Sequence, residues 1–144
     1  MNPYIKQYNQ YKQNAIMTAS PETILIMLYE GAINFLMRAK IAIDEKNIEE
    51  SHELIIKTEK IIRELMNSLD METGGDVAQN LYRLYEYLHH NLVQANIKKD
   101  TALIDDVLTH LRDLKQTWEE AIKIASRENK ELNGEDGEET DRRA

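Results

Sequence analysis

The stretch "TASPETILIMLYEGAINFL", residues 18–36, opens with a helix start signal and then becomes apolar on two sides. Ser20 is a favourable N-cap residue, and Pro21 suits the first position inside a helix. The sequence therefore predicts a helix that begins at Pro21 and runs to about Asp44. A helix on the outside of a small globular protein needs one apolar face, so the second face requires an explanation.

The apolar residues of this helix form two stripes. The first is enough to fill the core of a helical bundle and comprises Leu25, Leu28, Ala32, Phe35, Leu36 and Ala39. The second is displaced around the helix and comprises Ile26, Tyr29, Ile33, Met37 and Ile41. It belongs either to a wide core, because a bundle helix contacts two neighbours, or to a groove for an amphipathic helix of a partner or for the chain's own N-terminus.

Gly31 lies inside the same helix, where glycine is less favourable than alanine by about 1 kcal/mol. A close approach of another backbone would explain a glycine at this position. We therefore expect a neighbouring segment to pass close to Gly31.

Three more helices follow, because apolar residues recur at spacings of three and four. They are expected over Ile48 to Asp70, over about Asp76 to Lys99, and from about Thr101 to near Ser126. The connections are short, which favours antiparallel neighbours. The chain has only five glycines and two prolines, and aromatic residues make up 6% of it. The predicted fold class is all-α: an antiparallel up-down four-helix bundle over residues 18–126.

The stripes of these three helices are expected to face the core. They comprise Ile48, Ile55, Thr58, Ile62, Leu65 and Leu69, then Val77, Leu81, Leu84, Leu88, Leu92 and Ala95, and finally Ile104, Val107, Leu108, Leu111, Leu114, Trp118, Ala121, Ile122 and Ala125. Outside its main stripe the third helix also carries Tyr82, Tyr85, Tyr87 and Val93. Tyrosine suits a surface that is covered and uncovered, because its hydroxyl can stay hydrated.

Both ends of the chain differ from the bundle. Residues 1–17 form a short amphipathic segment with Tyr4, Ile5, Tyr8 and Tyr11 at spacings of one, three and three, and the segment is too short to hold a helix alone in water. We expect it to dock on the bundle as a lid or to move. The segment 127–144 has almost no apolar residue after Leu132 and is expected to be an acidic disordered tail.

Composition excludes several function classes. The formal net charge of -8 repels nucleic acids and anionic lipids, and no cluster of Lys and Arg offsets it, so neither is expected as a partner. The absence of cysteine excludes disulfides, thiolate chemistry and Cys-based zinc sites, which fits a cytosolic protein. The N-terminus lacks the apolar run of a signal peptide, and the longest apolar run, Ile24 to Tyr29, is too short for membrane insertion.

An enzyme is not expected. Glu49-x-x-His52 and Glu86-x-x-His89 match the spacing used in di-metal bundles. However, an antiparallel hairpin places Glu86 opposite about residue 59, about 15 Å along the axis from Glu49, too far for one metal pair. No Gly-rich phosphate loop, serine elbow or cysteine nucleophile occurs. No cofactor and no metal is expected, and a metal-binding or phosphotransfer bundle, the latter using His52 or His110, is a remote alternative.

Taken together, the motifs resemble the flagellar secretion chaperone family FliS. The resemblance rests on Tyr8, Thr18-Ala19-Ser20-Pro21-Glu22, Met27-Leu28-Tyr29-Glu30-Gly31-Ala32, Ser68-Leu69-Asp70, Gly74-Gly75, Ala78-Gln79-Asn80-Leu81-Tyr82, Leu84-Tyr85-Glu86-Tyr87, Ala95-Asn96 and Trp118. It covers about residues 4–125. Thr23 stands where the family usually has an acidic residue, and Glu30 where it usually has Asp.

The resemblance implies a cytoplasmic chaperone that holds the C-terminal region of flagellin, prevents premature polymerisation and delivers flagellin to the export apparatus, whose gate recognises the loaded complex. It also implies that the N-terminal segment covers an apolar surface until flagellin binds. The residues expected to contact the partner are Tyr4, Ile5, Tyr8, Tyr11, Ile26, Tyr29, Ile33, Met37, Tyr82 and Tyr85. A structural bundle that forms a homodimer through the same stripe remains an alternative, and the oligomeric state stays open.

Overall fold

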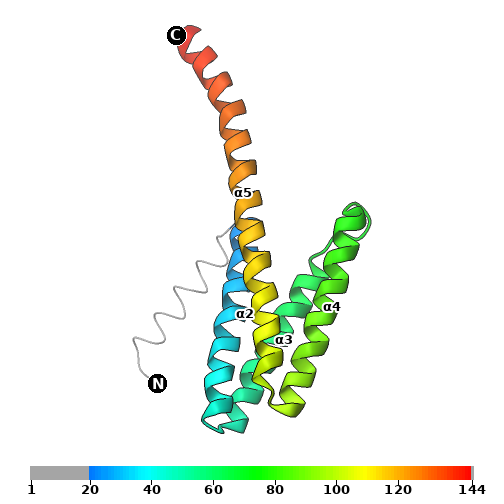
Figure 1. Ribbon diagram of the computed structural model, residues 1–144. Helices are drawn as coiled ribbons and strands as arrows, with labels where there is room; N and C mark the ends of the chain where they lie inside the picture. The colour runs from blue at the N-terminus through cyan, green and yellow to red at the C-terminus, as the bar shows by residue number, and fades with distance from the viewer. Residues whose placement is uncertain (1–19, 144) are drawn as a thin grey trace.

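Four helices make up the part of the chain that the computed structural model describes, residues 20–143. They are α2 (Pro21–Asp44), α3 (Ile48–Asn67), α4 (Gly75–Lys98) and α5 (Thr101–Arg143). Each packs against the next one in the chain, and α5 packs against α2 (Figure 1). The helices alternate in direction and enclose one core, which confirms the predicted all-α up-down bundle.

Local hydrogen bonds set the starts of α2 and α3 where the sequence predicts them. The Ser20 hydroxyl accepts a hydrogen bond from the backbone N–H of Thr23, 3.2 Å away, and Pro21 occupies the first helical position. Asn47 caps α3 in the same way. Between α3 and α4 the Asp70 carboxylate accepts from Thr73 and Glu72, and these hydrogen bonds lower the pKa of Asp70. This turn explains why α3 ends at Asn67 rather than at Asp70.

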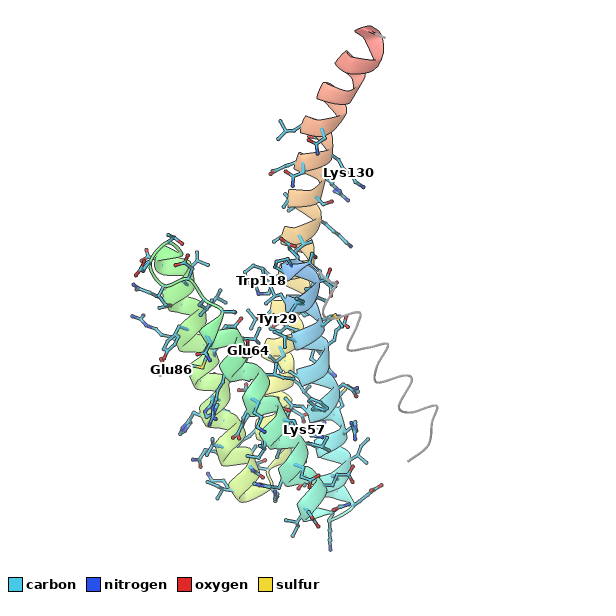
Figure 2. The ribbon with its side chains drawn as sticks, turned by 180° about the vertical axis from the view of Figure 1, so that it is seen from behind. Tyr29, Lys57, Glu64, Glu86, Trp118 and Lys130 are labelled. Atoms are coloured by element: carbon cyan, nitrogen blue, oxygen red, sulfur yellow. The ribbon has the colours of Figure 1, made fainter. Side chains whose placement is uncertain are left out.

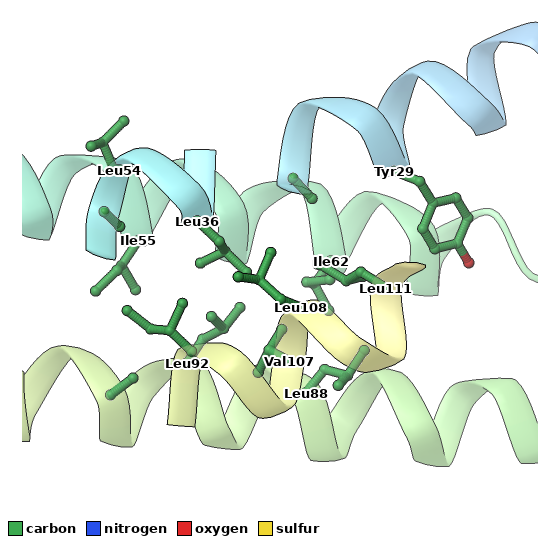
Figure 3. Packing of buried hydrophobic residues seen from close by; sticks show 14 of the residues in the cluster. Tyr29, Leu36, Leu54, Ile55, Ile62, Leu88, Leu92, Val107, Leu108 and Leu111 are labelled. Atoms are coloured by element: carbon green, nitrogen blue, oxygen red, sulfur yellow. The ribbon is translucent and has the colours of Figure 1, made fainter. Parts of the chain in front are cut away.

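The core is sealed over the half of the bundle nearest the α2–α3 turn. Figure 3 shows part of its packing, in which residues from all four helices interdigitate. The fully buried apolar residues include Ala32, Leu36, Ala39, Leu54, Ile55, Ile62, Leu88, Leu92, Ala95, Ile104, Val107, Leu108 and Leu111. Toward the opposite end, Leu25, Leu28, Leu81, Leu84, Leu114 and Trp118 are only partly buried. The end at which α2 begins is therefore the more open one.

Four residues expected in the core are exposed instead. Ile48 is 65% exposed and Val77 is 67% exposed, because each lies in the first turn of its helix, beyond the reach of its neighbours. Ala121 and Ala125 are exposed because α2 begins at Pro21 with a polar turn that does not cover them. The helical period locates a face, but it does not show where the neighbouring helix ends.

Helix α5 continues to Arg143, so the end expected near Ser126 is wrong. The sequence beyond Ser126 holds no proline, and its residues 127–133 are all exposed as the helix projects from the bundle (Figure 1). Helix formation without packing is marginal for a segment of this length. The disorder of 127–144 in solution stays a prediction. No described helix combines the length and the apolarity that a membrane span requires.

Within residues 20–143, no backbone makes the close approach expected at Gly31. Among the residues that the structure describes, a Cβ atom built on Gly31 meets only the Cδ1 atom of Ile61, at 3.5 Å, which is an ordinary van der Waals contact. The residue therefore has room for a methyl group in the folded chain. Nothing in the bundle itself explains the glycine.

Replacing Gly31 with alanine should raise the free energy of unfolding by about 1 kcal/mol, because alanine loses less backbone entropy in a helix and the site has room for it. Urea denaturation followed by circular dichroism measures the change. The matched control is Gly75→Ala, which should lower stability because Gly75 has φ +56, a left-handed conformation that alanine adopts poorly. A loss of stability in Gly31→Ala would contradict this account of the site.

Candidate functional site

A groove with a volume of about 850 Å³ lies between the first turns of α2 and the stretch of α5 from Trp118 to Asn133. Its apolar lining comprises Ile26, Met27, Trp118, Ala121, Ile122 and Ala125. Its polar edge includes Glu22 and Glu30 from α2 and Lys130 from α5. Figure 2 shows Trp118 and Lys130 on the same helix, with Lys130 beyond the end of the bundle. The groove is therefore an apolar surface with a charged rim.

The pairing of α2 with α5 explains why the groove lies at this end. Lys40 pairs with Asp105 at 2.5 Å, and Glu30 lies 3.6 Å from Lys115. The two helices are antiparallel, so each step of ten residues back along α2 corresponds to a step of ten residues forward along α5. By this register, Ile122 and Ala125 lie level with Thr23 and Ser20. These two small polar residues of α2 are too short to cover the apolar face of α5.

Ion pairs on the surface join α2 to α5 at the edge of the groove and below it, but they add little stability. Lys115 contacts both Glu119, at 3.0 Å, and Glu30. The hydrogen bond with Glu119 raises the pKa of Lys115, so the ammonium group stays charged at neutral pH. These pairs set the register of the two helices, and the apolar residues supply most of the energy.

A buried hydrogen-bond network forms the boundary between the sealed core and the groove. The hydroxyls of Tyr29 and Tyr85 are hydrogen-bonded to each other, and the two side chains are 0% and 1% exposed. The indole N–H of Trp118 donates to the Tyr29 hydroxyl at 3.2 Å. Burial raises the pKa of both phenols, so both remain neutral over the physiological range. The network links α2, α4 and α5; Figure 2 labels two of its members, Tyr29 and Trp118.

The structure separates the residues that the sequence proposed as one partner-binding surface. Ile26 lines the groove, and Ile33 and Met37 continue the same face of α2, with Ile33 half-buried and Met37 48% exposed. Tyr82, 36% exposed, lies on α4 and does not line the groove. Tyr4, Ile5, Tyr8 and Tyr11 lie outside the described residues.

Tyr29 and Tyr85 are buried in this conformation, which favours a core role for them over direct contact with a partner. Of the two interpretations of the second stripe of α2, Tyr29 thus fits the wide core and Ile26 fits the groove. Met37 and Ile41 are exposed, at 48% and 56%, and fit neither a core nor this groove.

Sequence reasoning assigned the α5 side of the groove to the core. Trp118, Ala121, Ile122 and Ala125 continue a stripe whose earlier members, such as Leu111, are fully buried. The register of α2 against α5 could have distinguished these residues from the buried members of the stripe. The last turns of the stripe lie opposite Ser20 and Thr23, which have no large apolar side chains. Periodicity alone treats all members of a stripe alike.

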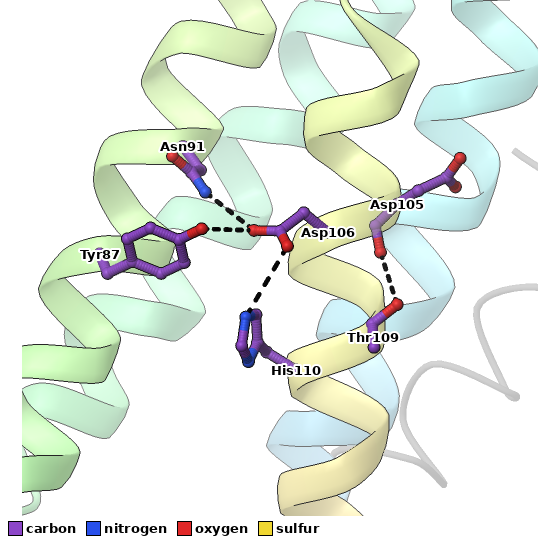
Figure 4. Close-up of polar contacts among 6 residues, drawn as sticks. All are labelled: Tyr87, Asn91, Asp105, Asp106, Thr109 and His110. Atoms are coloured by element: carbon purple, nitrogen blue, oxygen red, sulfur yellow. Dashed lines mark hydrogen bonds and ion pairs between the residues drawn. The ribbon is translucent and has the colours of Figure 1, made fainter.

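Helices α4 and α5 are joined by a polar cluster on another side of the bundle (Figure 4). Asp106 accepts hydrogen bonds from the hydroxyl of Tyr87 at 2.8 Å and the side-chain amide of Asn91 at 3.0 Å. His110 lies 3.8 Å from Asp106, and its ring meets Tyr87 edge to face. This arrangement holds two helices together, and it leaves His110 occupied by structural contacts.

The residues considered for a metal site are placed apart. The Nδ1 atom of His52 accepts a hydrogen bond from Asn96, 2.9 Å away, whose amide oxygen in turn accepts from Lys99. His89 and Glu86 instead border a small pocket between α3 and α4. Within residues 20–133, no cluster of three or more His, Asp or Glu side chains has a geometry that could hold a metal ion.

Comparison with known proteins identifies the family. The family described as "Flagellar protein FliS" matches residues 4–125. The flagellar secretion chaperone FliS of Bacillus subtilis is 34% identical over 130 residues, which is 90% of this chain and 94% of that protein. The one from Salmonella typhimurium is 35% identical over 124 residues, covering 85% of this chain and 92% of that protein.

A solved structure described as "Crystal structure of flagellar chaperone from bacteria" shares the fold, with a TM-score of 0.68 and 25% identity over 84% of this chain and 98% of that one. FliS is a chaperone family and not an enzyme family, which confirms the prediction that this chain is not an enzyme. On this evidence the chain belongs to the FliS family of flagellar secretion chaperones.

Proposed function

We propose that this chain is a cytoplasmic export chaperone that holds the C-terminal region of flagellin in the groove between α2 and α5. In this role it prevents premature polymerisation of flagellin and delivers it to the flagellar export apparatus, whose gate receives the loaded complex. The observation that carries the proposal is the apolar groove of about 850 Å³ in a chain of the FliS family. The family supplies the class of cargo, and the groove supplies a surface to hold it.

The size of the groove suits an amphipathic helix. Its α5 wall runs from Trp118 to Asn133, roughly 22 Å at 1.5 Å per residue, which is the length of about four helical turns. An amphipathic helix presents apolar side chains along such a length at spacings of three and four. Burial of these side chains against Ile122 and Trp118 removes apolar surface of both partners from water, which is the main source of affinity.

The same burial explains how the chaperone would prevent polymerisation. Apolar faces through which flagellin molecules associate are covered while they lie in the groove, so other copies of flagellin cannot reach them. Release must remain possible, and the ordering of a flexible cargo segment on binding lowers the affinity for the area buried. A half-open groove with a charged rim therefore suits a cargo that is held and then handed on.

We also propose that residues 1–17 act as a lid over this groove when flagellin is absent. The support is positional: the segment leads directly into Ser20, which lines the groove, and it carries the apolar side chains of Tyr4, Ile5, Tyr8 and Tyr11. A lid lowers the apparent affinity for cargo, because cargo must displace it. It also covers an apolar surface that would otherwise promote association.

Calorimetric titration with a flagellin C-terminal segment tests the groove. The unchanged chain should bind at micromolar concentration, and Ala125→Asp should weaken binding by about tenfold or more, because a carboxylate would be buried against an apolar helix face. Ala125 is exposed, so the substitution spares the fold.

The matched control is Ala102→Asp, which places the same change on an exposed alanine at the other end of α5. It should leave the affinity unchanged. Absence of binding by the unchanged chain at tens of micromolar would overturn the proposed function. Equal affinities of the two variants would exclude this groove as the site.

Replacing Ile5 and Tyr8 together with serine tests the lid. If residues 1–17 cover the groove, the double variant should bind the flagellin segment a few-fold more tightly than the unchanged chain, because less has to be displaced. The same titration measures this, with Lys6→Ser as the control for a polar position of the segment. Unchanged affinity would remove the segment from the mechanism, and weaker binding would show that it contacts the cargo instead.

A further inference from the structure

We propose that Tyr85, which does not line the groove, is a positioning residue that sets the affinity of the groove by fixing Trp118 through the Tyr29 hydroxyl. The inference rests on the proposed function, because it assigns a role in binding at the α2–α5 groove. The inference goes beyond the proposed function because it places a determinant of affinity on α4, a helix that contributes no residue to the groove wall.

Trp118 has two roles. Its side chain forms part of the groove lining, and its indole N–H donates to the Tyr29 hydroxyl at 3.2 Å. The indole is the largest apolar side chain of the groove, and it is half-buried. A rotation of this ring would therefore change the shape of the groove more than a movement of any other lining residue.

The Tyr29 hydroxyl, which accepts from Trp118, is itself held by a hydrogen bond from α4. Tyr29 is fully buried, so water does not compete for its hydroxyl, and its partner is the hydroxyl of Tyr85. A tyrosine hydroxyl has one proton and two lone pairs. The hydrogen bond to Tyr85 restricts how Tyr29 turns its lone pairs, and so restricts where the indole N–H can point.

The hydrogen-bond network of Tyr29, Tyr85 and Trp118 spans the core of the bundle. Tyr29 and Tyr85 come from helices that lie across the core from one another, since the neighbours of α2 are α3 and α5. Below the pair, Leu88 and Leu111 are completely buried, whereas above it Leu25 and Leu81 are only partly buried. The pair thus lies between the fully buried part of the core and the open end at which the groove lies.

Tyr85→Phe removes one oxygen atom and keeps the ring. The emission spectrum of Trp118, the sole tryptophan, should shift in the free protein, and the affinity for the flagellin segment should fall about fivefold, the effect of one hydrogen bond. Tyr87→Phe is the matched control, because it makes the same change two residues away on the same helix. The Tyr87 hydroxyl binds Asp106 at the exposed α4–α5 surface, so this variant should change neither readout.

A second control separates positioning from loss of stability. Ile55→Val shortens a fully buried side chain of α3 and should lower stability without altering Trp118 emission or affinity. Tyr85→Phe with the emission and affinity of the unchanged chain would overturn the proposal. An equal loss of affinity in Ile55→Val would also overturn it, because stability alone would then explain the effect.

One measurement needs no variant and no cargo. The indole N–H of Trp118 should exchange with solvent more slowly than the N–H of a free indole, which nuclear magnetic resonance can follow in the unchanged chain. Exchange at the free rate would overturn the positioning role even if Tyr85→Phe failed to fold. If flagellin did not bind at all, the proposed function would fail, whereas emission and indole exchange would still decide whether Tyr85 and Tyr29 hold Trp118.

Discussion

The apolar face of α5 is longer than the helices that can cover it. It runs from Ile104 to Ala125, and its first half is completely buried by the other three helices. Its last turns lie level with the start of α2, where Ser20 caps the helix and neither Ser20 nor Thr23 has a large apolar side chain. The capping that makes α2 begin cleanly also leaves the end of the α5 stripe uncovered, and that uncovered end is the groove.

This mismatch divides the bundle into a part that provides stability and a part that is available for binding. The four helices are held together by the core around the buried side chains of α2 from Leu36 to Ala42. Apolar side chains are buried there without any partner protein. Above the Tyr29–Tyr85 pair, Leu25 and Leu81 are only partly buried, so a further segment can still bury area against them. A chaperone that must take up and release an apolar segment needs both properties in one small chain.

Much of the fold follows from the sequence, because helical period, caps and glycine pairs are local signals. Pro21 and Asp44 bound α2 as expected, and α4 begins within one residue of the expected start. The burial of Tyr29 and Tyr85 could not be predicted, because a buried hydroxyl requires a partner that lies 56 positions away in the chain. The α5 wall of the groove was assigned to the core for a related reason: a stripe shows which face is apolar, but only the register of α2 against α5 shows where the covering helix ends.

The central claim is that cargo lies between α2 and α5, and amide hydrogen exchange of the chaperone with and without the C-terminal region of flagellin tests it most directly. Binding should slow exchange in residues 22–30 and 118–130, the two walls of the groove. The amides of α3 lie on the other side of α2 and should exchange as before. Slowed exchange confined to α3 and α4, with both groove walls unchanged, would contradict the account.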